Sequence, residues 1–368
     1  DDEDRVAGGG EVLAEADLAL DDGPGDGRPD LGLGAEGALP LEGRDFRVGL
    51  SEEAQAVLHR FEPGLGGLQV ALRPDDVVLG RLIILQRHRL GLEQLLLARR
   101  DGPEVEGASA LAIGTAFTAD FRPEAIGRTA QVRATAAAVG EAMVQAGLDT
   151  PEDVHFVQVK CPLLTSARIQ EAAERGESVA THDTYASMGL SRGASALGIA
   201  LALGEVSGED LSDAAIGMRR DLYSGRASAS AGIELMHNEV IVLGNARGWS
   251  GPHAIAHRVM RDGIDFGAIQ GVLADLGFSS SGQLAPGMSE RVVALLAKAE
   301  PSHDGLIRGR RHIMNDDSDI NATRHARALV GGVAAAAVGR TDLFVSGGAE
   351  HQGPDGGGPV AIIARVRD

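Results

Sequence analysis

Short apolar runs alternate with longer segments of helical periodicity from residue 111 onward. This pattern predicts four strands, and an Ala-rich segment that ends at Gly147 predicts a helix between the first two. A second helix is expected to begin at Ser191, as its N-cap, and to run to Leu203. Strands that alternate with helices are typical of the α/β class. The predicted strands are residues 111–115, 153–160, 222–230 and 239–243, and the first helix is residues 128–146.

The last third of the chain repeats this order of elements. Helices are expected at 266–276, 289–297 and 323–338, and strands at 343–346 and 359–366. An internal repeat with matching chemistry indicates a site built around a pseudo-symmetry axis.

The first 107 residues have a different pattern. They contain no Lys, Thr, Tyr, Asn, Met, Cys or Trp, and Ser51 is their single serine. Helices are predicted at 51–61 and 81–100, and the Gly-, Asp- and Pro-rich segment 21–40 is expected to be a loop or disordered. Two interpretations of this composition stay open: a divergent repeat unit, or a segment translated in a wrong reading frame.

Composition narrows the class of protein. A length of 368 residues is enough for two or three units of domain size. The net charge of -19 disfavours a nucleic-acid partner and an anionic membrane surface. No apolar run approaches the roughly 18 residues of a membrane span. Cys161 is the single cysteine, which excludes an internal disulfide and leads us to expect a reducing, cytoplasmic location.

The candidate chemistry lies in a motif that occurs twice. The pattern Ser-x-Gly-x-Glu begins at Ser230 and again at Ser346. A lysine precedes each copy, and these two, Lys160 and Lys298, are the only lysines in the chain. An arginine lies between lysine and serine in both copies: Arg192 in the first and Arg324 in the second.

These residue types suit nucleophilic catalysis. A serine hydroxyl needs a base, and a lysine can serve as one when burial or nearby positive charge favours its neutral form. The small residues after each serine let backbone N–H groups approach an oxyanion. The alternative is that each copy is a tight turn at the end of a strand, with glycine chosen for its backbone conformation.

The chain resembles the ring-opening amidohydrolases, the family of the cyanuric acid hydrolases and barbiturases. The resemblance covers about residues 108–368. It is carried by residues 159–165, 187–195, 228–235, 297–302, 309–312, 317–320, 323–327 and 346–354.

This resemblance implies an α/β fold of three similar units around a pseudo-threefold axis, with a central barrel of strands ringed by helices. The units would be residues 1–107, 108–250 and 251–368. The first unit is atypical, because it lacks the lysine, arginine and Ser-Gly-Gly that the family expects there.

The resemblance also implies the reaction. Ser230 would be the nucleophile and Lys160 its general base, opening the ring of cyanuric acid to carboxybiuret, which decarboxylates to biuret. Lys298 is a possible supporting residue. The residues expected to hold the other parts of the substrate are Arg192, Ala231, Arg324, Ser346 and Gly347.

A structural divalent metal, Mg²⁺ or Ca²⁺, and no organic cofactor are further implications of the resemblance, as is a homotetramer. Oxygen ligands of one carboxylate and several carbonyls suit either ion. The implied ligands are Glu300, Ala349, Gln352, Gly353, Pro354 and Gly357.

Two alternatives stay open. One is a barbiturase, which opens a similar planar ring. The other is a catalytically defective scaffold that binds planar heterocycles, because the motifs of the first unit are missing. The hypothesis of a nucleotide-phosphate site in the Gly-rich segment 346–358 is weak, because the chain has no G-x-x-x-x-G-K-[ST] motif.

Overall fold

The computed structural model describes residues 69–70, 80–89, 92–101, 109–312 and 321–367, with side chains from 109–312 and 321–367. The chain divides into two compact units, one of residues 1–69 and 87–94 and the other of residues 70–86 and 95–368. Strands β1 (Gln69–Val70), β2 (Gly80–Arg89) and β3 (Leu92–Asp101) form a sheet in the order β1-β3-β2.

The helix predicted at 81–100 is therefore wrong. Leu and Ile suit either element when their spacing has no clear period, and pairing between strands decided the outcome here. The helix predicted at 51–61 and the loop predicted at 21–40 lie outside the described residues.

The second unit contains a four-stranded sheet in the order β4-β7-β5-β6. Strands β5 and β6 are parallel, and β7 runs antiparallel to both β4 and β5. Most residues of β5 are buried, including the neighbours Phe156 and Val157, as expected for a strand inside a covered sheet. The strands are β4 (Ser109–Phe117), β5 (Val154–Pro162), β6 (Ala227–Gly232) and β7 (Glu239–Arg247).

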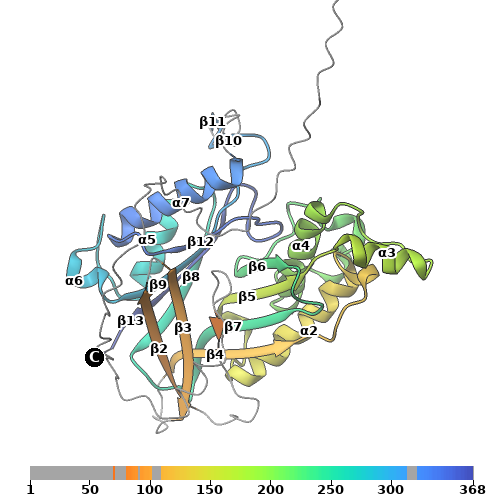
Figure 1. The fold of residues 1–368 in the computed structure, drawn as a ribbon. Coiled ribbons are helices and arrows are strands. Elements are labelled where there is room, and N and C mark those ends of the chain that lie inside the picture. Colours follow the sequence, from red (N-terminus) through yellow and green to blue (C-terminus); the bar gives the residue numbers. More distant parts are fainter. Residues whose placement is uncertain (1–68, 71–79, 90–91, 102–108, 313–320, 368) are drawn as a thin grey trace, which may run out of the picture. The chain divides into compact units, whose positions relative to one another are not determined.

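Helices α2 (Thr129–Ala146) and α4 (Thr184–Ala202) pack against this sheet and against each other (Figure 1). Their close approach needs a residue without a side chain, because a Cβ on Gly198 would lie 2.6 Å from the Cβ of Thr135. The third helix is α3 (Ser166–Glu174). Short 3₁₀ turns complete this part: η1 (Pro123–Ala125), η2 (Pro151–Asp153), η3 (Gly208–Asp210) and η4 (Asp213–Ala215).

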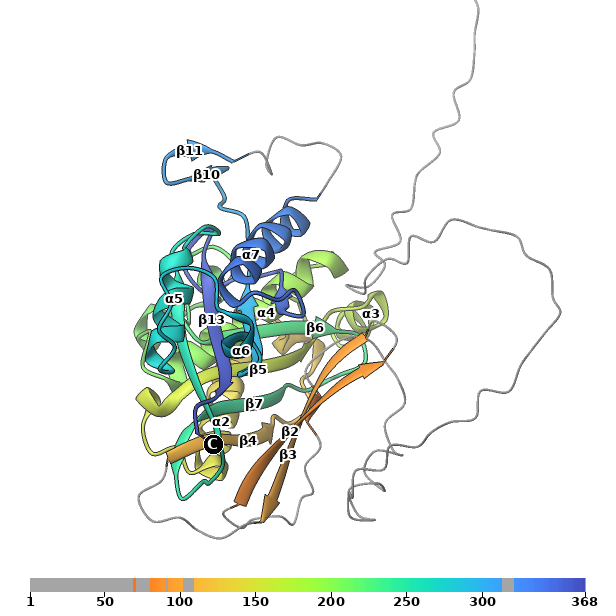
Figure 2. The ribbon, with the colours of Figure 1, turned by 90° about the vertical axis from the view of Figure 1, so that its left-hand side faces the viewer.

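A second four-stranded sheet has the order β12-β9-β13-β8. Figure 2 shows helices α5 and α7 beside it. The strands are β8 (His253–Met260), β9 (Val292–Lys298), β12 (Phe344–Ser346) and β13 (Gly358–Arg365). The helices are α5 (Phe266–Asp275), α6 (Pro286–Ser289) and α7 (Ala322–Val338), and a small hairpin joins β10 (Leu306–Ile307) to β11 (Arg310–Arg311).

The two four-stranded sheets have the same topology. In each, the first strand pairs antiparallel with the last, the last pairs antiparallel with the second, and the second pairs parallel with the third. In chain order, β4, β5, β6 and β7 thus correspond to β8, β9, β12 and β13. The duplicated order of elements seen in the sequence is therefore also present in the strand pairing.

The α/β class is confirmed, with corrections in detail. Most of the segment 289–297, expected to be helical, belongs to β9 (Val292–Lys298), because it pairs with β13 along most of its length and with β12 from Leu296 onward. Helix α4 begins at Thr184 with Asp183 as its N-cap, so the predicted N-cap Ser191 lies buried inside the helix. Strand β8 was not predicted.

The strands of the described residues form open sheets, and no closed barrel is found among them. The central barrel and the threefold arrangement of units 1–107, 108–250 and 251–368 stay predictions. No helix in the described part of the chain is long and apolar enough to cross a membrane.

Polar side chains link the two four-stranded sheets. The side chain of Asn245 on β7 both donates to the Ile255 carbonyl and accepts from the Ile255 N–H on β8, at 2.7 and 3.0 Å. Nearby, the Nδ1 atoms of His155 and His257 lie 2.8 Å apart. Such a contact requires one ring to donate and the other to accept, so the accepting ring is neutral.

Protonation of this histidine pair should weaken the fold. Burial lowers the pKa of His155 to about 4, and burial, followed by the charge of His155, lowers that of His257 to about 3. Because both values lie below the roughly 6.5 of an unfolded histidine, the stabilisation is complete above pH 6.5 and is lost as the pH falls toward 4 and then 3. The loss is on the order of 3 kcal/mol for one such histidine.

In the wild-type protein, the urea concentration at the midpoint of unfolding should fall between pH 6.5 and 4.5. We expect this fall to be smaller in His257→Asn. The exposed His182 offers a control, because His182→Asn should keep the wild-type slope. Equal slopes in all three proteins would remove this pair from the acid sensitivity of the fold.

Candidate active site

Lys160 and Ser230 lie directly opposite each other on the parallel strands β5 and β6. Both side chains are partly exposed. The Lys160 ammonium forms an ion pair with Glu234, the last residue of the same motif, with Nζ and Oε1 3.1 Å apart. Among the described contacts, no hydrogen bond joins Lys160 to Ser230. The backbone therefore places the two predicted catalytic residues side by side, and the lysine is held by the motif's own carboxylate.

Lys298 and Ser346 occupy the same register in the second sheet, on β9 and β12. Here the Lys298 ammonium does donate to the serine: Nζ lies 3.0 Å from the Ser346 Oγ and 2.8 Å from the Gly347 carbonyl. Lys298 is fully buried. The second copy thus has the direct Lys–Ser contact that the first copy lacks.

The two motif glutamates have different partners. Glu350 forms a bidentate ion pair with Arg192 of helix α4, with both N–O distances 2.8 Å. Burial raises the pKa of Glu350, but the hydrogen bond and charge of Arg192 outweigh it and hold that pKa below its usual range. Arg192, expected to bind substrate, is thereby fixed to the opposite sheet's motif.

Gly348 is required at its position for two reasons. Its φ of 65° is in the left-handed region, which favours glycine. In addition, a Cβ there would lie 2.7 Å from the Cζ of Arg192. The second glycine of Ser-Gly-Gly therefore lets the guanidinium reach Glu350.

Arg324 is exposed in the first turn of α7. Two other residues of this helix lie closer to the motif, because a Cβ on Gly347 would be 2.4 Å from Thr323 Cγ2 and 3.4 Å from Arg327 Cδ. Ala231 lies on β6 opposite Cys161. The structure thus places Arg192, Ser346 and Gly347 together, and it leaves the substrate contact of Arg324 a prediction.

Five of the six predicted metal ligands lie in the loop after β12, and the sixth, Glu300, follows β9. Burial raises the pKa of the Glu300 carboxyl, which accepts from the Ala349 N–H at 2.9 Å and from Thr323 Oγ1 at 3.4 Å. Glu300 has no ion-pair partner among the described residues. A buried carboxylate of this kind fits a cation site.

The loop carbonyls also fit such a site. The Ala349 carbonyl accepts from Gln352 N, and the Pro354 carbonyl accepts from Gly357 N. Each carbonyl keeps a second lone pair for a cation. Gly353, with φ of 111°, allows the loop to turn back between them. The described residues contain no group of three His, Cys, Asp or Glu side chains for a metal, so any ion here would be held mainly by carbonyl oxygens.

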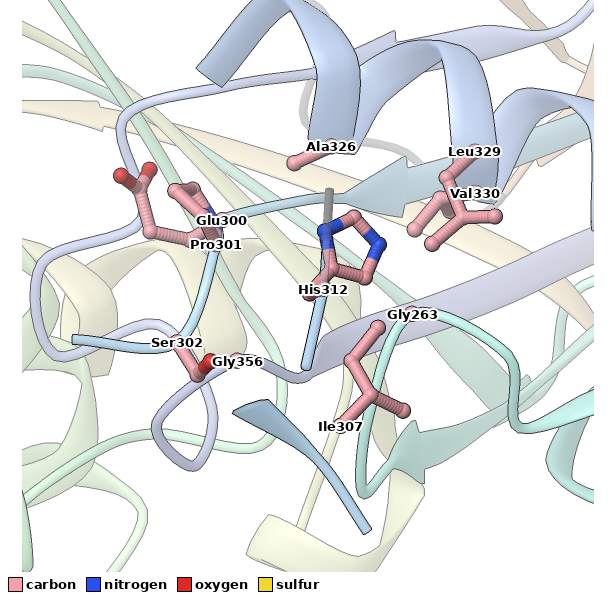
Figure 3. Close-up of a pocket in the computed structure, with 10 residues that line it drawn as sticks. All are labelled: Gly263, Glu300, Pro301, Ser302, Ile307, His312, Ala326, Leu329, Val330 and Gly356. Carbon is pink, nitrogen blue, oxygen red and sulfur yellow. The ribbon is translucent and has the colours of Figure 1, made fainter. Parts of the chain in front are cut away.

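A hollow beside this loop is shown in Figure 3. Its walls include Glu300, Ser302, His312 and Gly356, whereas Lys160 and Ser230 are not among its lining residues. The hollow therefore belongs to the predicted metal loop rather than to the catalytic pair.

Two buried features of the structure were not predicted. The first is His351, which is buried at a φ of 59°. Its Nδ1 donates to the Leu222 carbonyl at 2.6 Å, and its Nε2 accepts from Gly217 N at 2.7 Å. His351 therefore ties the segment before β6 to the second motif. Its position next to Glu350 was the only signal in the sequence.

The second unpredicted feature is a buried polar network around Gln131 of helix α2. The Gln131 side chain accepts from Gly127 N and donates to Ser191, Ser195 and Asn238. This network ties α2, α4 and Asn238, the residue before β7, together. A glutamine in an Ala-rich helix gives no sign of such a role in the sequence.

Comparison with known proteins identifies the family. Residues 94–365 match the model of the family described as amidohydrolase ring-opening protein. The chain belongs to this family. It is an amidohydrolase, and the resemblance seen in the sequence is confirmed.

Individual ring-opening amidohydrolases are closely similar to this chain. The cyanuric acid amidohydrolase of Ectopseudomonas oleovorans is 62% identical over 255 residues, 69% of either chain. That of Azorhizobium caulinodans is 58% identical over 270 residues, 73% of either chain. A crystal structure of the cyanuric acid hydrolase from A. caulinodans has a TM-score of 0.65 at 57% identity and covers 73% of both chains.

The Arg192–Glu350 pair should matter for stability. Removing one partner of this partly buried pair leaves an uncompensated charge, so Glu350→Ala should cost up to about 3 kcal/mol, measured as a shift in urea denaturation. Asp275→Ala is the control, because the Arg258–Asp275 pair is about half exposed and should contribute about 0–1 kcal/mol. A Glu350→Ala protein as stable as the control would show that the pair does not hold the sheets together.

Proposed function

We propose that this chain hydrolyses cyanuric acid by opening its ring, with Ser230 as nucleophile and Lys160 as general base. The proposal is supported by the relatives named cyanuric acid amidohydrolase. The observation that carries the mechanism is the Lys160–Ser230 register, repeated as Lys298–Ser346 with a 3.0 Å hydrogen bond.

The proposed steps follow from these positions. Neutral Lys160 takes the hydroxyl proton as Ser230 Oγ attacks a ring carbonyl carbon. The ring C–N bond breaks, and its nitrogen takes a proton from the lysine. Water then cleaves the acyl-serine and releases carboxybiuret, which loses CO₂ to give biuret. Glu234 accepts a hydrogen bond from the lysine whenever the lysine is an ammonium.

The other groups hold the substrate. We propose that N–H groups after Ser230, at Ala231 first, face the developing oxyanion, where one donor is typically worth about 10²–10³ in rate. Ser346 and Gly347 would bind a second carbonyl, with Lys298 supporting Ser346. Arg192 and Arg324 would bind the remaining oxygens of the substrate, while Arg192 stays paired with Glu350.

We further propose that Glu300 and the carbonyls of Ala349, Gln352, Gly353, Pro354 and Gly357 hold a structural Mg²⁺ or Ca²⁺. The ion would neutralise the Glu300 carboxylate and fix the loop that follows Ser346. The three-unit barrel, the homotetramer and the cytoplasmic location also stay proposals that rest on the family.

Turnover tests the proposed reaction. Purified protein should deplete cyanuric acid, followed by its ultraviolet absorbance, faster than barbituric acid. Ser230→Ala and Lys160→Ala should each lower kcat by at least about 10³-fold, as expected when a nucleophile or its base is lost. A variant near the wild-type rate would remove that residue from the mechanism.

Two results would favour the other candidates. Faster turnover of barbituric acid would make the chain a barbiturase. Binding of cyanuric acid with no turnover of either ring would make it a defective scaffold, as the atypical first 107 residues suggest.

Metal content tests the ion. Elemental analysis of purified protein should find about one Mg²⁺ or Ca²⁺ per chain, and Glu300→Gln should lose it because the only carboxylate ligand is gone. Chelation should lower the melting temperature of the wild type and leave that of Glu300→Gln unchanged. Metal-free wild-type protein with an unaltered melting temperature would contradict the site.

A further inference from the structure

The peptide groups of β6 point alternately toward β5 and away from it. Among the described strands, β6 is the last of its sheet, and β5 is the one strand that pairs with it. Val157 N donates to the Arg226 carbonyl, which fixes the phase of this parallel ladder. Residues 226, 228 and 230 therefore face β5, and residues 227, 229 and 231 face the open edge.

The open edge at Ala229 is occupied by the side chain of Gln352. Its Oε1 accepts from the Ala229 N–H at 2.7 Å, and its Nε2 donates to the Gly348 carbonyl at 3.0 Å. A second, longer contact joins Nε2 to the Glu350 carbonyl at 3.5 Å. Gln352 is fully buried, so no water replaces these partners.

The other polar group of Ala229 is also held from the second sheet's side. The Lys298 Nζ lies 3.4 Å from the Ala229 carbonyl oxygen, while the same ammonium donates to Ser346. Both the N–H and the C=O of Ala229, the residue before Ser230, are thus bonded to side chains that lie 123 and 69 positions away in the sequence.

We propose that Gln352 is a positioning residue for Ser230, an inference that rests on the proposed function. Its side chain bonds to the Ala229 N–H, in the place where a neighbouring strand would bond. This contact fixes the backbone that orients the Ser230 hydroxyl and the N–H of Ala231, which also faces the open edge. Its side chain is engaged in this way, so its part in a metal site would be limited to its backbone carbonyl.

The positioning role has a clear physical basis. A nucleophile and its oxyanion donor must be held within about 0.5 Å of the productive geometry. An edge strand with an unpaired N–H is free to twist or to admit water at that point. An amide can satisfy this N–H and donate to Gly348 at the same time, which an aliphatic side chain cannot do.

The amide is specific to the second motif. Gln352 comes six residues after Ser346, and the residue six after Ser230 is Met236. Methionine is close to glutamine in length and shape, so Gln352→Met removes the hydrogen bonds with little change in volume.

The experiment compares Gln352→Met with Gln131→Met. Gln131 is equally buried and also accepts from a backbone N–H, but its bonds end on Gly127, Ser191, Ser195 and Asn238. We expect kcat for cyanuric acid to fall about 10–100-fold in Gln352→Met with KM within about threefold, since the geometry rather than the binding is disturbed. Gln131→Met should lose stability and keep its kcat per folded molecule.

Two further readouts separate positioning from a general structural role. In a Ser230→Ala background, Gln352→Met should bind cyanuric acid with an unchanged Kd. Hydrogen exchange of the peptide that covers residues 227–232 should quicken in Gln352→Met and not in Gln131→Met. If Gln352→Met does not fold, Gln352→Asn can take its place, because asparagine has the same amide on a side chain one methylene shorter. It should show the same changes in kcat and hydrogen exchange, with smaller size.

The outcomes are distinct. A wild type that turns over cyanuric acid while Gln352→Met matches Gln131→Met in kcat and exchange overturns this inference alone. A wild type without turnover overturns the proposed function, and unchanged exchange at residues 227–232 would then overturn the backbone contact as well.

Discussion

The Arg192–Glu350 ion pair is the contact on which the rest of the site depends. It joins helix α4, which packs on the first four-stranded sheet, to the motif at the end of β12 in the second. Around it, Gly348 clears space for the guanidinium, and the next two residues, His351 and Gln352, bond to the segment that leads into Ser230. A bidentate, partly buried pair fixes distance and orientation together, which a single hydrogen bond does not.

The choice of partner for Glu350 makes the two motif copies unequal. In the first copy, Glu234 pairs with Lys160 of its own unit, and the lysine stays partly exposed. In the second copy, the glutamate pairs with an arginine of the other sheet, and Lys298 is buried and bonded to Ser346. The two sheets therefore have the same strand topology but different ion pairs at the motif. In the proposed mechanism, this inequality agrees with Ser230 as the nucleophile and Ser346 as a substrate-binding residue.

Sequence reasoning reached some of these features and missed others for physical reasons. Strand β5 was predictable because apolar and polar residues alternate over much of its length, and helix α2 because Gly147 ends it in the left-handed conformation that glycine favours. Strand β9 was mistaken for a helix because a short apolar run fits both elements, and only pairing with β12 and β13 decides between them. The N-cap of α4 was misplaced because Ser191, a plausible cap, lies on the buried side of a helix that begins earlier.

The sequence by itself determined the α/β class, the two copies of the motif and the pairing of each lysine with its serine. These depend on local patterns that repeat along the chain. Only the tertiary structure decided which carboxylate each cation takes, where His351 bonds, and that Gln352 reaches Ala229. Those contacts join residues up to 158 positions apart. Such pairs produce no periodic pattern in the sequence, because a buried polar side chain has to match one distant partner rather than its neighbours along the chain.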